Sequence, residues 1–193
     1  MRSFLRHVLF PAVMLLVVLT LLTGAVYPAI VTAVAQVAFP HQANGSMITV
    51  DGKTVGSSLI GQAFSDPKYF WGRPSAAGKD GYDASGSAGS NLGPTSQALI
   101  DRITADVDRV RAANGGGPVP VDLVTTSASG LDPDISPAAA AYQVARVAAA
   151  RGMTVADVQA ALDRHTQQPM LGFLGEPRVN VLLLNLDLDG LLR

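Results

Sequence analysis

Hydrophobic and polar positions divide the chain into one long apolar stretch and a patterned remainder. No Asp, Glu, Lys or Arg occurs between Arg6 and Asp51. Within this interval, residues 8–30 (VLFPAVMLLVVLTLLTGAVYPAI) exceed the roughly 18 to 20 apolar residues that a helix needs to cross a bilayer. Pro11 falls in the predicted first turn, where a missing N–H does no harm. The pattern therefore predicts a single membrane span.

The charges that flank the span predict its orientation. Arg2 and Arg6 precede it, and the next basic residue is Lys53. Because short segments rich in Lys and Arg stay in the cytoplasm, residues 1–7 are expected inside and the rest of the chain outside.

A cleaved signal peptide is the alternative, with the AVA at residues 33–35 as its cleavage site. The apolar core of a signal peptide is only about 7 to 15 residues long, which favours the anchor. We expect a transmembrane helix over residues 8–35 and a linker over residues 36–46. An extracytoplasmic domain is expected over residues 47–193.

Turn signals dominate the first part of this domain. Asp51-Gly52 stands between two short apolar runs and predicts a β-hairpin. Residues 65–76 gather three aromatic residues around prolines, and a tract rich in glycine and serine follows at residues 86–97. We expect that tract to be an ordered loop. Its glycines, Gly86, Gly89 and Gly93, would allow the backbone to adopt positive φ and to approach another surface closely, and Ser90 and Asn91 would form local hydrogen bonds.

Three helices are predicted from spacing and capping residues. The first begins at Pro94 and has apolar residues at helical spacing along one face. Asn114 and the glycines after it end this helix. The second has Ser136 as its N-cap and Gly152 as its stop. The third begins at Thr154, with an acid three residues later as in a capping box.

Two apolar runs read as strands, residues 119–125 and residues 181–188. The second is too short and too interrupted to span a bilayer. The exported part holds about 150 residues, the usual size of one domain. The predicted architecture is a single-pass anchor that carries one α+β domain.

Composition excludes several classes of protein. The chain has 193 residues, a formal net charge of −1 and no cysteine, and 48% of its residues are apolar. A nearly neutral chain has no surplus of positive charge to bind nucleic acid. The lack of cysteine excludes a disulfide framework, a thiolate metal site and a cysteine nucleophile.

Candidate chemistry is sparse. The three histidines are scattered, so no metal site is expected, and no phosphate-binding G-x-x-x-x-G-K-[ST] motif occurs. Ser65 and Lys68 satisfy the S-x-x-K spacing of serine acyl-enzymes, but Pro67 disfavours the helix that would bring them together. An exported serine hydrolase or a binding module stays as the alternative to an accessory protein, and the sequence predicts no catalytic residue.

An ordered series of segments resembles the C subunit of the Kdp-type potassium-transporting ATPase. The segments include FPHQANGS, YFWGRPSA, SAGSNLGPTS, VPVDLVTTSASGLDPDISPAAAAYQVARVA and VNVLLLNLDLD. They occur in order over nearly the whole chain, the predicted span included.

The resemblance implies a non-catalytic subunit of a bacterial inner-membrane pump. Its partners would be a channel-like A subunit that selects potassium, a P-type ATPase B subunit and a small F subunit. The C subunit of that family is described as a catalytic chaperone that raises the ATP affinity of the B subunit. No intrinsic cofactor is implied: ATP would be shared with the B subunit, and the partners would handle potassium.

The resemblance also suggests functional residues. Gln143 falls where the family has its proposed nucleotide-contacting glutamine, although a glutamine amide serves equally well to hold a neighbouring loop. The polar turns are expected to form docking or structural loops that pack together. Their residues are Arg73, Pro74, Ser75, Ser90, Asn91, Leu92, Ser129, Gly130, Leu131 and Asp132.

Overall fold

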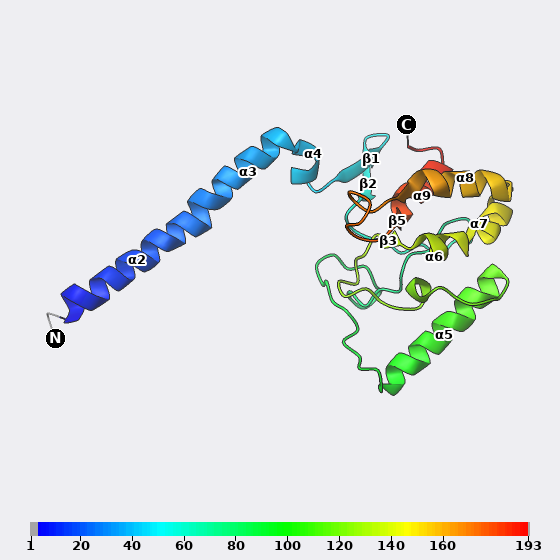
Figure 1. Ribbon diagram of the computed structural model, residues 1–193, viewed down its shortest axis with the longest axis horizontal. Coiled ribbons are helices and arrows are strands. Elements are labelled where there is room, and N and C mark those ends of the chain that lie inside the picture. The colour runs from blue at the N-terminus through cyan, green and yellow to red at the C-terminus, as the bar shows by residue number, and fades with distance from the viewer. Residues whose placement is uncertain (1–3, 193) are drawn as a thin grey trace. The chain divides into compact units, whose positions relative to one another are not determined.

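The computed structural model describes residues 4–192. It divides the chain into two units, Met1–Met47 and Ile48–Arg193. The first unit is dominated by helix and the second holds helices and two small sheets, so the single-span α+β fold class is confirmed (Figure 1).

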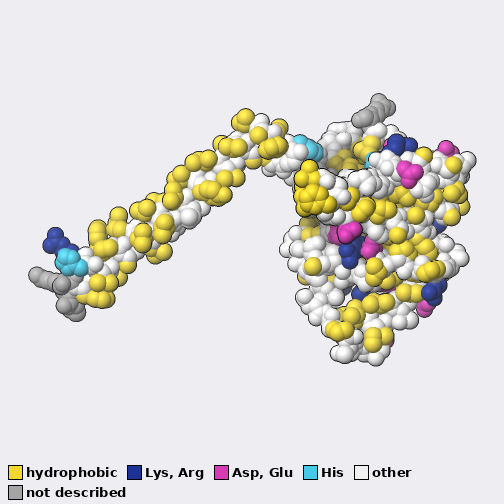
Figure 2. Space-filling model, in the orientation of Figure 1, with side chains coloured by type: hydrophobic (Ala, Val, Ile, Leu, Met, Phe, Trp, Pro, Cys, Tyr) yellow, Lys and Arg dark blue, Asp and Glu magenta, His cyan; other side chains and the backbone are white. Residues whose placement is uncertain are grey.

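The first unit contains one long apolar helix. It consists of η1 (Leu5–Leu9), α2 (Phe10–Leu21), η2 (Leu22–Val26) and α3 (Tyr27–Ala38). Residues Arg6–Ala38 are long and apolar enough to cross a membrane, with a mean hydropathy of 2.5. The side chains of residues 6–34 are exposed, and Figure 2 shows hydrophobic groups along the helix.

Two features depart from a regular span. The π-helical turn η2 comes just before Pro28, which has no N–H for the ladder of hydrogen bonds. The helix also continues to Ala38, and the segment expected as a linker contains the short helix α4 (Pro40–Ala43). Phe39 breaks the path between them, because its backbone leaves the helical region at φ −139° and ψ 57°.

The second unit begins with the predicted hairpin. Strands β1 (Met47–Val50) and β2 (Lys53–Ser57) pair across Asp51 and Gly52. Both turn residues have positive φ, 49° and 76°, which is the geometry of a type I′ turn.

A second sheet joins three short strands that are distant in sequence. The order is β3 (Asp134–Ile135), β5 (Arg178–Asn180) and β4 (Thr166–Gln167), and both pairs are antiparallel. Around it lie α6 (Pro137–Ala141), α7 (Val144–Arg151), α8 (Val155–His165) and α9 (Val181–Leu188) (Figure 1). Their buried side chains form the core, which includes Phe70, Ile135, Val147, Val158, Leu162, Val179 and Leu184.

The capping residues act as predicted. The Ser136 hydroxyl accepts a hydrogen bond from the Ala139 amide at 3.2 Å, and the Thr154 hydroxyl accepts one from the Asp157 amide at 3.1 Å. The helix predicted from Pro94 is α5 (Gln97–Asn114), which begins three residues later. Gly115, with φ 82°, is its C-cap. Pro94 itself lies in the preceding turn.

Both strand predictions for the apolar runs were wrong. Residues 119–125 contain the 3-10 turn η3 (Val121–Leu123), because Pro118 and Pro120 have no N–H for a ladder. Residues 181–188 form α9, which Asn180 caps by accepting a hydrogen bond from the Leu183 amide at 3.1 Å. This helix is buried on most sides, so its sequence lacks the polar face that identifies a surface helix.

The helix predicted between residues 137 and 151 is interrupted. Helix α6 ends at Ala141 and α7 begins at Val144. Tyr142 and Gln143 form the turn between them, and the Gln143 side chain is fully buried. The interruption therefore places one amide side chain inside the domain.

Candidate functional site

Residues 58–96 contain no helix or strand, so other contacts must fix their path. Many of these contacts come from the segment that precedes β3 in the chain. We call residues 71–82, 87–89 and 125–134 the loop cluster, because they hold one another through polar contacts and close backbone approach. The cluster contains seven of the ten residues predicted to form docking or structural loops.

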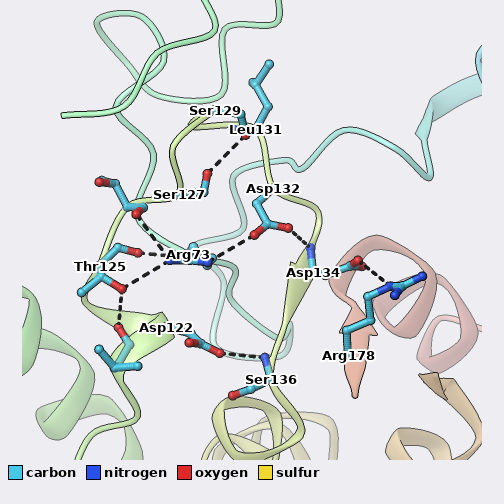
Figure 3. A network of polar contacts seen from close by, with 12 residues as sticks. Arg73, Asp122, Thr125, Ser127, Ser129, Leu131, Asp132, Asp134, Ser136 and Arg178 are labelled. Carbon is cyan, nitrogen blue, oxygen red and sulfur yellow. Dashed lines mark hydrogen bonds and ion pairs between the residues drawn. The ribbon is translucent and has the colours of Figure 1, made fainter. Parts of the chain in front are cut away.

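Arg73 lies at the centre of the loop cluster. Its Nε and Nη2 donate to the carbonyl oxygens of Thr125 and Thr126, both at 3.3 Å. Its Nη1 pairs with Asp132 Oδ2 at 3.3 Å. Figure 3 shows the guanidinium reaching both the Thr125 side and the Asp132 side of the same segment. One side chain thus holds the two ends of the 125–132 turn.

Ser75, which follows Pro74, fixes the next contact. Its hydroxyl donates to the Gly130 carbonyl at 2.6 Å and accepts from the Tyr82 amide at 2.7 Å. The Tyr82 hydroxyl in turn donates to the Arg73 carbonyl at 2.6 Å. Burial raises the pKa of Tyr82 to about 12, with a further rise from the charge of Asp132. Tyr82 therefore stays a neutral hydrogen-bond donor at neutral pH.

Gly130 permits a close backbone approach in the cluster. Its φ is 67°, and an added Cβ would lie 2.6 Å from the Ala88 carbonyl oxygen and 2.7 Å from the Ala77 nitrogen. Beside it, the Ser129 carbonyl accepts hydrogen bonds from the Ala88 amide and the Ser87 hydroxyl, both at 3.0 Å. The glycine-rich tract is thus packed against the 127–134 turn through its first residues.

The centre of that tract behaves differently from the prediction. Asn91 and Leu92 are exposed, and Ser90 is half-buried. Among the hydrogen bonds of the described residues, none involves the side chain of Ser90 or Asn91. The predicted positive φ at Gly86, Gly89 and Gly93 was wrong, since Asn91 adopts it instead, at 52°.

The three glycines differ in whether they permit a close backbone approach, and none of them has the predicted positive φ. A Cβ on Gly89 would lie 3.0 Å from the Ala128 carbonyl oxygen, so this glycine is needed for close approach. A Cβ on Gly93 would have nothing within 4 Å. The sequence therefore identified a close approach correctly and its backbone angle incorrectly.

The end of the 125–134 segment carries its own polar contacts. The Ser129 hydroxyl accepts from the Leu131 amide at 3.1 Å, and the Leu131 carbonyl accepts from the Gly61 amide at 2.8 Å. Asp132 Oδ1 accepts from the Asp134 amide at 3.0 Å (Figure 3). These bonds lead the chain from the loop cluster into β3.

Next to the loop cluster is a groove of about 540 Å³ that is lined by several acidic side chains. Its charged lining residues are Arg73, Asp122, Asp132, Asp134, Glu176 and Arg178. Burial, and then the charge of Asp132, raises the pKa of Asp134, while Arg178 opposes the rise through an ion pair at 3.1 Å. Within residues 4–192, no group of three or more acidic or histidine side chains is arranged to hold a metal ion.

Gln143 is completely buried and binds the backbone of Trp71. Its Oε1 accepts from the Trp71 amide at 2.8 Å, and its Nε2 donates to the Trp71 carbonyl at 3.1 Å and to the Ala139 carbonyl at 3.2 Å. Arg146 Nη2 adds a bond to the same Oε1 at 2.7 Å. Every polar atom of the amide is therefore engaged inside the domain.

Asn185 on α9 makes the same pair of bonds with Phe70, the residue that precedes Trp71. Its Oδ1 accepts from the Phe70 amide at 2.8 Å, and its Nδ2 donates to the Phe70 carbonyl at 3.0 Å. Together, Gln143 and Asn185 form what we call the amide clamp. It holds two consecutive residues of a segment that has no neighbouring strand.

Sequence reasoning missed Asn185 and Arg146. The Arg146 guanidinium lies 4.0 Å from the centroid of the Trp71 ring and donates to the carbonyls of Pro67 and Tyr69. Burial lowers its pKa to about 10, so it stays charged at neutral pH. A polar residue inside the apolar run of residues 181–188 was the one available signal for Asn185.

The structure gives no support to the Ser65 and Lys68 pair. Ser65 lies outside any helix, and Asp66 turns the chain by accepting a hydrogen bond from the Lys68 amide at 2.9 Å. The Lys68 ammonium lies 4.9 Å from the centroid of the Tyr69 ring. The helical turn that brings such a serine and lysine together is absent from this segment.

Comparison with known proteins relates the whole arrangement to one family. The family described as "K+-transporting ATPase, c chain" matches residues 9–190, which include nearly all of the span, the loop cluster and the amide clamp. The chain belongs to this family. Membership makes it one subunit of a potassium-transporting ATPase and not an enzyme by itself.

Individual relatives support the assignment over nearly the full length. A potassium-transporting ATPase KdpC subunit of Sorangium cellulosum is 61% identical over 182 residues, 93% of this chain and 96% of the relative. Proteins with the same description match from Herpetosiphon aurantiacus, at 56% identity over 98% of this chain and 97% of the relative, and from Paraburkholderia phytofirmans, at 57% over 96% and 97%. The family likeness therefore extends across both units of the chain.

Proposed function

We propose that this chain is a non-catalytic accessory subunit that assembles and stabilises a high-affinity potassium-uptake complex. Its partners in this proposal are the channel-like A subunit, the ATP-hydrolysing B subunit and the small F subunit. The observation that carries it is the use of the domain's polar residues: Arg73, Ser75, Gln143 and Asn185 all bind the chain's own backbone. Such a domain presents a fixed surface to a partner.

The proposed location is the bacterial inner membrane, with the N-terminus in the cytoplasm and the domain outside. The support is the asymmetry of charge, since Arg2 and Arg6 precede the span and Lys53 is the next basic residue. Potassium would reach the pump from the side on which the domain lies.

We further propose that the chain raises the ATP affinity of the B subunit indirectly, by fixing the assembled state of its partners. A direct nucleotide contact would need an accessible amide, and the Gln143 side chain is buried with all of its polar atoms engaged. A partner that binds one conformation better than another shifts the population without touching the nucleotide.

The test of assembly is purification in mild detergent from potassium-starved cells, with and without this chain. We expect the other subunits to co-purify with it and their potassium-stimulated ATPase activity to collapse in its absence. If the chain purifies alone and the ATPase is indifferent to it, the accessory role is wrong.

The test of the indirect mechanism compares Gln143→Leu with Asn185→Leu in the assembled complex. Each residue holds one backbone position through a pair of hydrogen bonds, and only Gln143 has a proposed nucleotide role. We expect both variants to lower the yield of complex in the same way, with equal KM for ATP in the complex that remains. A KM increase confined to Gln143→Leu would instead establish a nucleotide contact.

A further inference from the structure

The connection between β4 and β5 contains a tight apolar turn. The Met170 amide donates to the Leu174 carbonyl at 3.0 Å, and the Leu174 amide donates back to the Met170 carbonyl at 2.9 Å. In addition, the Gly172 amide donates to the carbonyl of Pro169, the residue before the pair, at 3.0 Å. We call residues 170–174 the apolar hairpin.

The side chains of the apolar hairpin are exposed although four of its five residues are large and hydrophobic. The exposed fractions are 69% for Met170, 78% for Leu171, 73% for Phe173 and 46% for Leu174. Figure 1 draws this segment as an orange loop, and Figure 2, in the same orientation, shows hydrophobic side chains gathered at that place. Clustered exposure of this kind marks a contact surface.

Backbone conformation adds a second observation. Leu171 has a φ of 56°, in the left-handed region that favours glycine and asparagine, and Gly172 follows at 80°. A turn needed only for connection would be better served by asparagine at the first position. The fold instead keeps a large apolar side chain at the end of the hairpin despite the backbone strain.

The chemistry of the hairpin favours lipid as its occupant. No charged residue occurs between His165 and Glu176, and the hairpin has no side-chain hydrogen-bond donor. The residues that dominate protein-binding hot spots, Trp, Tyr and Arg, are all absent from the hairpin. The paired backbone groups of Met170 and Leu174 also meet the requirement that polar groups entering an apolar phase be satisfied internally.

The bilayer is always within reach of the domain. The span ends at Ala38 and the second unit begins at Ile48, so the connection can extend to at most about 35 Å. A domain of this size has a radius of gyration of about 15 Å. Because the tether keeps the domain at a high effective concentration near the membrane, even a small apolar insertion is sufficient for contact.

We propose that the apolar hairpin inserts into the interfacial region of the bilayer that holds the chain's own span, as a second membrane contact. Insertion of this kind places apolar side chains about 5 to 10 Å into the head-group and acyl boundary. The contact would restrict the orientation of the domain. It depends on the anchor and not on the potassium pump.

The test uses the full chain in nanodiscs of phosphatidylcholine and phosphatidylglycerol, without other subunits. Because the chain has no cysteine, Phe173→Cys can carry a single nitroxide label, and Ala105→Cys on exposed α5 is the matched control. We expect the ratio of collisions with oxygen to collisions with a water-soluble nickel chelate to be several-fold higher at position 173. Leu171→Asn, which suits the local backbone, should lower that ratio in the Phe173→Cys background.

Two results would overturn the proposal. One is a label at position 173 that is as accessible to nickel as the label at 105. The other is shielding of position 173 that appears only when the remaining ATPase subunits are present, which would make a protein the occupant. Neither result bears on the accessory role, which is measured by co-purification and ATPase activity.

Discussion

Gln143 and Trp71 are joined by two hydrogen bonds between one side-chain amide and one residue's backbone, at 2.8 and 3.1 Å. Asn185 makes the same pair of bonds with Phe70, at 2.8 and 3.0 Å. The amide clamp thus supplies from α9 and from the turn between α6 and α7 what a neighbouring strand would supply in a sheet. It explains how a long irregular segment keeps one path through the core.

The clamp predicts a large stability cost for Gln143→Leu. The substitution leaves the Trp71 amide and carbonyl without partners in the interior, at about 1 to 3 kcal/mol for each buried group. We expect a loss of about 3 kcal/mol in the free energy of unfolding, measured by denaturant titration of the full chain in detergent. Gln159→Leu is the control, because Gln159 is only half-buried and its amide bonds to Asp163 of the same helix, so the change in stability should be less than about 0.5 kcal/mol. Equal effects would show that the clamp is not needed.

Gly130→Ala should damage the loop cluster through its backbone. The added Cβ meets the Ala88 carbonyl oxygen at 2.6 Å, and the residue must also hold a φ of 67°. We expect a loss of about 2 to 4 kcal/mol, from overpacking together with the strained backbone. Gly117→Ala has φ 86° but nothing within 4 Å, so it isolates the backbone part and should cost about 1 kcal/mol. Circular dichroism melts of both variants would separate the two terms.

Tyr82→Phe should have an effect that depends on pH. The folded pKa of about 12 lies above the unfolded value of about 10, so the folded state retains a proton that the unfolded state loses between these values. Stability from this group is therefore full below pH 10 and falls as the pH rises toward 12. At pH 8 the variant should be less stable by about 1 kcal/mol, since it lacks the bond to the Arg73 carbonyl.

The measurement for Tyr82 is urea unfolding of wild type and variant at pH 8 and pH 11. We expect the difference between them to shrink at the higher pH, because only the wild type carries the titrating phenol. A difference that stays constant would mean that Tyr82 ionises equally in both states.

Arg73→Lys should loosen the loop cluster although it keeps the positive charge of the side chain at position 73. A lysine can still pair with Asp132, but one ammonium cannot also reproduce the planar set of bonds to Thr125 and Thr126. We expect faster amide hydrogen exchange over residues 125–132 and a stability loss of about 1 to 2 kcal/mol. Arg164→Lys is the matched control, since that side chain is exposed and its ion pair with Asp187 lies outside the loop cluster. Unchanged exchange in the Arg73 variant would contradict the central role of this residue.

Local signals predicted much of the fold. The Asp51-Gly52 turn and the caps at Ser136 and Thr154 act through bonds between residues at most three positions apart, so a short stretch of sequence contains all that is needed. The span follows equally from local composition, because the length of an apolar run is compared only with the thickness of a bilayer. That the 86–97 and 125–134 segments form loops that pack together was instead an implication of the family resemblance.

The sequence by itself determined the apolar span, the starts of α6 and α8, the turn between β1 and β2 and the family likeness, which all depend on neighbouring residues or on ordered motifs. The tertiary structure decided the rest. Residues 181–188 became a helix because burial on most sides removes the periodicity that separates helix from strand. Gln143 became a clamp because its partner Trp71 lies 72 positions away along the chain, and only folding brings the two together.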